Sequence, residues 1–141
     1  MAVPSIAPWL KALYQRLSDD ETLADLSFNG RGVPITDNPA DQKIQTPFVV
    51  YSDIEMSNDD NKTSDGWQIR GRIHVYSEYQ GSLEMAGIMD RVYVLLHHQC
   101  LSPAGSINWL VFCDLVTTFT EPDGVTRHGV IRYTARMQED I

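Results

Sequence analysis

The sequence predicts a single α+β domain, in which an antiparallel or mixed sheet of about four main strands carries helices packed on one side. Three observations support this prediction. Residues 66–77 alternate between apolar and polar side chains, as in a strand with one buried face. Residues 83–96 repeat apolar side chains at helical spacing directly after a polar turn. The other strand-like segments flank this pair, so the coarse order is helix, strand, strand, helix, strand, strand.

Length and composition favour one soluble domain covering residues 1–141. The net charge of -8 argues against a general attraction to nucleic acid or to an anionic membrane. No basic region followed by an apolar run suggests a signal peptide, and no apolar stretch is long enough to span a membrane. Two cysteines are too few for a disulfide framework, which favours a reducing compartment.

The N-terminal third combines a short helix with a long irregular segment. Pro8 suits a first helical turn, and Trp9, Leu13 and Leu17 follow on one helical face. A second short turn follows residues 18–21. Residues 27–47 contain several Gly and Pro and predict a long loop, either one that wraps the sheet or an arm that binds a partner.

Residues 48–56 predict a strand that forms a long hairpin with the strand at 66–77, across a polar turn at residues 57–65. The expected alternation places Phe48, Val50, Ser52 and Ile54 on one side and Val49, Tyr51 and Asp53 on the other. In the next strand, one side is apolar and the opposite side carries Gln68, Arg70, Arg72 and His74.

The helix at residues 83–96 is expected to begin at Ser82, whose hydroxyl would cap it, with Glu84 near the positive end of the helix dipole. Six apolar side chains form the stripe that would lie on the sheet: Leu83, Ala86, Met89, Val92, Tyr93 and Leu96.

Two further strands complete the predicted sheet. Residues 107–118 alternate so that both faces are apolar and both are expected to be buried. One face would carry Trp109, Val111, Cys113 and Leu115, and the other Leu110, Phe112 and Val116. Residues 121–124 (Glu-Pro-Asp-Gly) predict a tight turn before the last strand, at 126–137.

Basic and acidic residues are segregated along the chain. Two strands carry five of the eleven Lys and Arg residues, whereas residues 19–65 hold eleven of the nineteen acids. This segregation indicates a basic sheet face that meets carboxylates, in its own loops or on a neighbouring copy. A solvated face and a phosphate or nucleic-acid contact are the alternatives. The candidate residues for a contact between copies are Arg70, Arg72, His74, Arg127, His128, Arg132 and Arg136.

No pattern predicts a metal site, a cofactor site or catalysis. His97, His98, Cys100 and Cys113 offer zinc-ligand types, but adjacent histidines rarely point at one ion and no C-x-x-C is present. The acidic segment 53–65 lacks the glycine of a calcium loop. Nucleophile, phosphate-loop and dinucleotide motifs are absent from the sequence, so we expect a protein that is not an enzyme and needs no cofactor.

Several short motifs occur in a characteristic order. The most specific is Pro-Asp-Gly-Val-Thr-Arg-His-Gly at residues 122–129. The weaker ones are Leu-Tyr-Gln-Arg-Leu at 13–17, Asp-Glu-Thr-Leu-Ala-Asp-Leu at 20–26, Thr-Pro-Phe-Val-Val-Tyr at 46–51, Ile-His-Val-Tyr-Ser at 73–77 and Leu-Leu-His at 95–97. Over nearly the whole chain, this order resembles the tail-completion, or tail-terminator, proteins of long-tailed bacteriophages and gene transfer agents.

The resemblance implies a structural protein of the virion tail or neck, assembled in the host cytoplasm without contact with a membrane. It implies a homo-oligomeric ring, usually of six copies, that caps the tail tube protein and ends its polymerisation. The ring would also join the head–tail connector protein and let DNA pass through its lumen without sequence-specific binding. The alternatives are a head–tail connector (neck) subunit and a soluble binding domain. Candidate contacts with tube or connector are Asp53, Asp59, Asp60, Asp65, Glu121 and Asp123.

Overall fold

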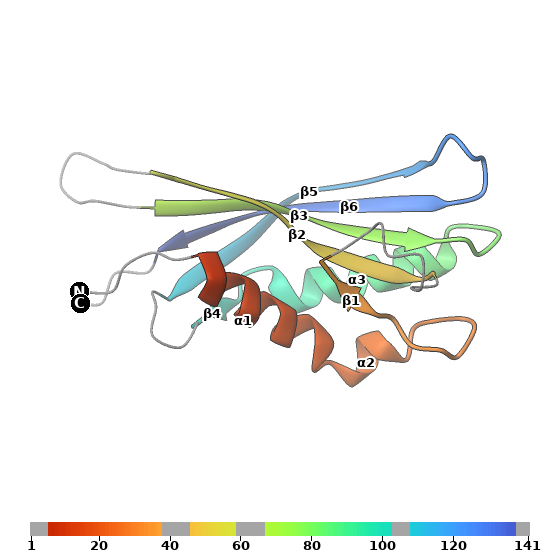
Figure 1. The fold of residues 1–141 in the computed structure, drawn as a ribbon, viewed down its shortest axis with the longest axis horizontal. Helices are drawn as coiled ribbons and strands as arrows, with labels where there is room; N and C mark the ends of the chain where they lie inside the picture. The colour runs from red at the N-terminus through yellow and green to blue at the C-terminus, as the bar shows by residue number, and fades with distance from the viewer. Residues whose placement is uncertain (1–5, 38–45, 59–66, 103–107, 138–141) are drawn as a thin grey trace.

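The protein consists of a six-stranded sheet with helices on one face (Figure 1). The structure is a computed structural model that describes residues 6–37, 46–58, 67–102 and 108–137. The elements are α1 (Ile6–Ser18), α2 (Glu21–Ala24), β1 (Ile35–Thr36), β2 (Phe48–Asn58), β3 (Trp67–Ser77), α3 (Leu83–Leu96), β4 (Cys100–Leu101), β5 (Trp109–Thr120) and β6 (Arg127–Met137). The α+β class and the placement of the helices on one side are as predicted.

The predicted count of about four strands and the predicted order of elements are wrong, because two additional strands lie at the edges of the sheet and the short helix α2 follows α1. The strand order is β1-β2-β3-β6-β5-β4. β1 pairs parallel to β2, and every other pair in the described sheet is antiparallel. β1 and β4 have two residues each, which is too short to produce a periodic pattern in the sequence. The four predicted strands are β2, β3, β5 and β6.

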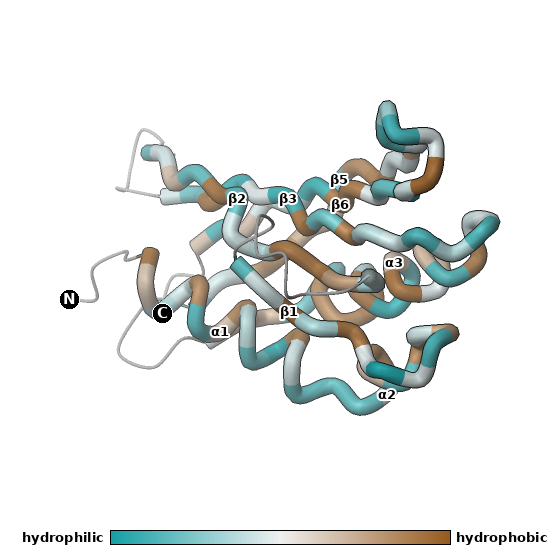
Figure 2. Tube along the Cα trace, turned by 45° about the vertical axis from the view of Figure 1, so that its right-hand side comes forward, coloured by the Kyte–Doolittle hydropathy of each residue, from teal (hydrophilic) through white to brown (hydrophobic). Residues whose placement is uncertain are grey.

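The core lies between the sheet and the helix layer (Figure 2), and its largest buried side chains are Trp9, Trp109 and Tyr133. Trp9 of α1 donates a hydrogen bond from Nε1 to the hydroxyl of Tyr133, 3.2 Å away. The ring of Tyr133 lies directly over Gly71 of β3, where a Cβ atom would overlap it. Burial raises the pKa of Tyr133, so the hydroxyl stays neutral and satisfies the indole N–H. A glycine on β3 therefore makes room for an aromatic ring from β6.

The predicted helix α1 is confirmed, and Trp9, Leu13 and Leu17 are buried on one face. Asp20 is the N-cap residue of α2, and its carboxylate accepts a hydrogen bond from the backbone N–H of Leu23 at 2.8 Å. The same carboxylate receives two hydrogen bonds from Arg91 of α3, both at 2.8 Å. The Arg91 guanidinium holds the pKa of Asp20 below its ordinary value, so one charged side chain caps α2 and fastens it to α3.

The predicted buried stripe of α3 is partly wrong. Leu83 is 75% exposed, whereas Glu84 is only 4% exposed. Glu84 is buried because its carboxylate accepts hydrogen bonds from the hydroxyl of Ser77 and from the backbone N–H of Phe28, each at 2.7 Å. Ser82 occupies the N-cap position, but its hydroxyl does not accept the predicted hydrogen bond from a backbone N–H of the first turn.

β-Bulges interrupt the predicted alternation in β2 and β5. The register shifts between Val50 and Asp53 in β2 and between Cys113 and Leu115 in β5. Each bulge adds one residue, so side chains beyond it point to the opposite face from the one predicted. Ile54 thus lies on the core side, Leu115 on the side away from the helices, and Val116 on the helix side. The expected burial of both faces of β5 is also wrong, because its residues are exposed from Asp114 to Thr120.

Candidate functional site

The two central strands of the sheet, β3 and β6, bring most of the predicted basic residues onto one surface. We define the outer face as the side of the sheet turned away from the helices. It carries alternate residues of the paired strands, namely Arg70, Arg72, His74, His128, Arg132 and Arg136. Arg127 is the exception, because it precedes His128 and so points to the opposite side, where its guanidinium donates to Thr120 Oγ1 at 2.9 Å.

Arg72 and Arg132 lie directly opposite each other in the β3–β6 ladder. Like charges in that position repel, but each arginine has a neighbouring aspartate. Arg132 Nε donates to Asp114 Oδ1 at 3.0 Å, and Arg72 lies 3.9 Å from Asp53 Oδ2. Asp114 is the residue that the bulge inserts in β5, and Asp53 directly follows the bulge in β2. The bulges thus place a carboxylate beside each arginine, in exposed pairs that contribute about 0–1 kcal/mol each.

Arg70 and Arg136 form no ion pair with any residue that the structure describes. They are exposed and border a groove of about 740 Å³ over the outer face. Carboxylates from β2 and β5 line the same groove, which lowers its positive charge. The groove lining includes Asp53, Glu55, Arg70, Arg72, Asp114, Arg132 and Arg136.

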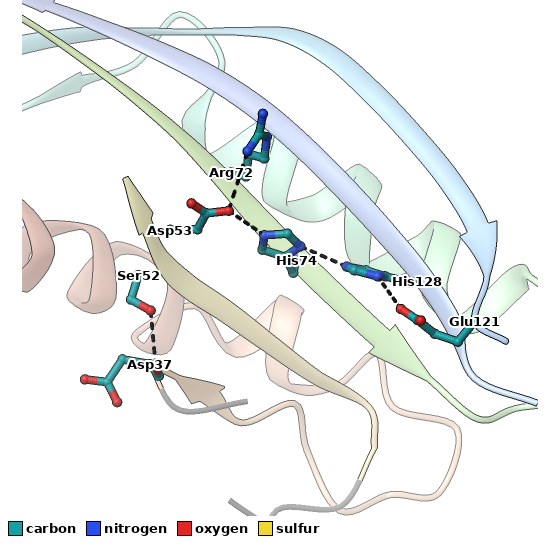
Figure 3. A network of polar contacts seen from close by, with 7 residues as sticks. All are labelled: Asp37, Ser52, Asp53, Arg72, His74, Glu121 and His128. Atoms are coloured by element: carbon teal, nitrogen blue, oxygen red, sulfur yellow. Dashed lines mark hydrogen bonds and ion pairs between the residues drawn. The ribbon is translucent and has the colours of Figure 1, made fainter. Parts of the chain in front are cut away.

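Two histidines connect two acids across the outer face (Figure 3). His74 Nε2 lies 3.0 Å from Asp53 Oδ2, and its Nδ1 lies 2.8 Å from Nε2 of His128. His128 Nδ1 lies 2.6 Å from Glu121 Oε1. Each carboxylate needs an N–H donor, and the contact between the rings needs one donor and one acceptor. All three contacts are therefore hydrogen bonds only when the two imidazoles hold three protons between them.

His128 occupies the more enclosed end of this network. Its ring stacks on Tyr76 with centroids 4.2 Å apart and contacts Phe119 at 4.6 Å. Burial lowers the pKa of His128, and the charge of His74 acts in the same direction, while the hydrogen bond to Glu121 opposes them. Burial also raises the pKa of Tyr76. Protonation of this network is thus sensitive to how the β5–β6 hairpin packs on β3.

The acids predicted to contact tube or connector occupy different places. Asp53 and Glu121 belong to the histidine network rather than to free loops. Asp123 closes the turn, where it accepts hydrogen bonds from the backbone N–H groups of Val125 and Thr126, both at 2.8 Å. The remaining candidates lie outside the described residues: Asp59, Asp60 and Asp65. The β2–β3 strand ends and the turn between β5 and β6 lie at opposite ends of the sheet (Figure 1).

The residues considered for zinc have structural contacts instead. His97 Nδ1 accepts a hydrogen bond from the backbone N–H of Cys113 at 3.0 Å, and its ring stacks on His98 with centroids 3.9 Å apart. Burial raises the pKa of the Cys113 thiol to about 12, which keeps it uncharged. In the part of the chain that the structure describes, no group of three or more His, Cys, Asp or Glu side chains is arranged to hold a metal ion.

Sequence reasoning found the basic residues of the central strands but missed other residues of the site, among them Asp114 and Tyr76. Asp114 was missed because its pairing with Arg132 follows from a bulge. Tyr76 was missed because its contact with His128 joins strands that are far apart in sequence. The only available signal was their position in strand-like segments next to the basic residues.

No helix in the described ranges is long and apolar enough to cross a membrane.

The family comparison and the structural comparison with known proteins point to the same kind of protein. The family model described as tail completion protein gp17 matches residues 11–138. A chain from the virion of a native gene transfer agent particle has a TM-score of 0.76 and 19% identity, with 96% of this chain and 100% of that chain covered. The gp17 protein of bacteriophage SPP1 has a TM-score of 0.59 and 21% identity, with coverages of 99% and 96%. No curated protein sequence is significantly similar to the chain.

Proposed function

The chain belongs to the tail completion protein gp17 family of virion proteins, and from this membership we propose that its copies form a closed ring, of six subunits, that terminates the tail. The ring caps the polymerised tail tube protein on one side and joins the head–tail connector protein on the other. DNA passes through its lumen without sequence-specific binding. The subunits assemble in the host cytoplasm before they enter the particle. The role is structural and involves no catalysis.

The family match over residues 11–138 carries this proposal, and the two ends of the sheet support it. A ring that joins two different partners needs two different rims, and the hairpin ends lie at opposite ends of the sheet (Figure 1). We propose that Asp59, Asp60 and Asp65, together with Asp53, contact one partner. Glu121 and Asp123, at the other end, contact the second partner.

The outer face supports a contact between copies. Arg70 and Arg136 are exposed and have no carboxylate partner among the described residues. We propose that these arginines, with the rest of the predicted basic set, are attracted to acids of the next copy in the ring. Arg72 and Arg132 contribute less, because each already has an aspartate neighbour.

Particles assembled without this protein test the proposal directly. Tail tubes of uncontrolled length, unattached to heads, are expected in electron micrographs, and added protein should restore both tail length and joining. Tubes of normal length that merely fail to join heads would instead indicate a neck subunit. Normal particles without the protein would contradict both roles.

Two sets of variants separate the rims. Asp59→Ala with Asp60→Ala should impair contact with one partner, and Asp123→Ala should impair contact with the other. Loss of tail capping in one variant and of head joining in the other is the expected result. The same defect in both would contradict the assignment of two rims.

A further inference from the structure

The edge of the sheet beside β5 is covered over only half of its length. β4 pairs with β5 at Trp109 and Leu110, and Gln99 and His98 exchange backbone hydrogen bonds with Val111 at 2.9 and 2.8 Å. His97 then accepts the backbone N–H of Cys113. Beyond that point β5 continues to Thr120, and no described segment pairs with its free side.

The uncovered part, residues 115–120 (Leu-Val-Thr-Thr-Phe-Thr), has a composition that favours strand pairing. It contains no charge, proline or glycine, and four of its six residues are β-branched. Leu115, Val116 and Phe119 are exposed apolar side chains on both of its faces. Edge strands of monomeric proteins are usually protected by lysine, proline or a covering segment. The described part of this edge beyond the bulge has none of these protections.

The opposite edge of the sheet has a matching gap. β1 pairs with β2 only at Val49 and Val50, and Ser52 Oγ donates to the Asp37 carbonyl at 3.1 Å. Residues 53–57 continue β2 past that point with β3 on one side, and within the described ranges no strand pairs with their other side. On the outer side of each edge strand, the described residues therefore provide a partner along the first half but none along residues 115–120 or 53–57.

The direction of the strands determines how these two edges would meet. β2, β3, β6 and β5 alternate in direction, because all three pairings between them are antiparallel. β5 therefore runs opposite to β2. When copies follow one another head to tail around a ring, the β2 of one copy lies antiparallel to the β5 of its neighbour. Pairing of these two segments also shifts the two copies relative to each other along the strand direction. The β1 of one copy and the β4 of the other then lie outside the paired segments.

We propose that residues 115–119 of β5 pair antiparallel with residues 53–57 of β2 in a second copy of this chain, with Thr117 opposite Glu55, and that this pairing is the principal contact of the ring. The inference rests on the proposed ring. It also accounts for the segregation of charge. The incoming strand carries Asp53 and Glu55 on the outer face and lies two strands, about 10 Å, from β6, which carries His128 and Arg132.

A matched pair of lysine variants tests the edge. Val116 is 50% exposed within the open edge, and Val125 is 56% exposed in the turn of the same hairpin. Val116→Lys should raise the protein concentration needed for assembly at least about tenfold, whereas Val125→Lys should assemble like the parent chain. Analytical ultracentrifugation measures both, and circular dichroism shows that each monomer is folded. Equal assembly by parent and Val116→Lys, with intact rings, would overturn the edge contact and leave the ring in place.

Cysteine cross-linking identifies the partner strand. Thr117 and Glu55 are both exposed on the outer face, and the exposed Cys100 is first replaced by serine. Chains with Thr117→Cys mixed with chains with Glu55→Cys should form a mixed disulfide dimer, and neither should cross-link alone. A product between two Thr117→Cys chains only would show that β5 pairs with itself, which contradicts the proposal. A parent that stays monomeric, alone and with tail tubes, would contradict the ring itself.

Discussion

Among the side chains of the outer face, His128 is the one whose charge depends most on its surroundings. It is 7% exposed, stacks on Tyr76 and contacts both His74 and Glu121. Burial and the His74 charge lower its pKa below the ordinary 6.5. In the folded state it therefore holds its proton less tightly than in the unfolded chain. Protonation of His128 then favours unfolding.

The free energy of unfolding is expected to fall as the pH is lowered through about 6.5, because the unfolded chain binds more protons in that range. The decrease ends below the folded-state pKa of His128. Urea denaturation at several pH values should show it, and His128→Gln should show a flatter profile. His98→Asn, which changes an exposed histidine outside the outer face, serves as the control and should keep the parent profile. An unchanged profile in His128→Gln would contradict the role of this histidine.

Among the elements, α1, β3 and β6 could be predicted because their apolar periodicity is uninterrupted. The faces of β2 and β5 could be predicted only as far as their bulges, since an inserted residue leaves no sign in a run of mixed side chains. The burial of Glu84 depends on Ser77 and on a backbone N–H of the loop after α2, which meet it only in the folded chain.

The site was predictable to the same extent as the strands that carry it. His74 and Arg132 were assigned to their faces because β3 and β6 alternate regularly. Contacts between strands depend on register and on sheet order, which local patterns do not encode. The link from His128 to Glu121 and the pairing of Asp114 with Arg132 are contacts of that kind.

Asp20 allows a test of how α2 is held. Asp20→Ala removes the cap of α2 and leaves Arg91 without its carboxylate, so it should destabilise the protein by about 1–2 kcal/mol. Asp19→Ala, at an exposed neighbouring position, is the control and should change stability by less than about 0.5 kcal/mol. Chemical denaturation measures both. Equal effects would show that the cap and the Arg91 contact contribute nothing specific.

For the whole molecule, the expected effect of the outer face is on assembly rather than on stability. The double variant Arg70→Glu, Arg136→Glu should weaken ring formation about tenfold or more at low salt, because like charges would then face the acids of the next copy. Added salt should reduce the difference from the parent chain. Lys11→Glu, an exposed charge reversal on α1, is the control. Ring formation by the double variant at parental concentrations would exclude the outer face from the contact.

The central position of β6 also has a consequence during synthesis. β3 acquires its second neighbour, β6, only after the ribosome has made the intervening chain between Ser77 and Arg127 and then β6 itself. Ile131, Tyr133 and Ala135 of that strand are fully buried. A nascent chain interrupted before β6 leaves the indole of Trp9 without its partner and exposes one side of β3. Such a fragment cannot complete the sheet and cannot bury the side chains that β6 covers.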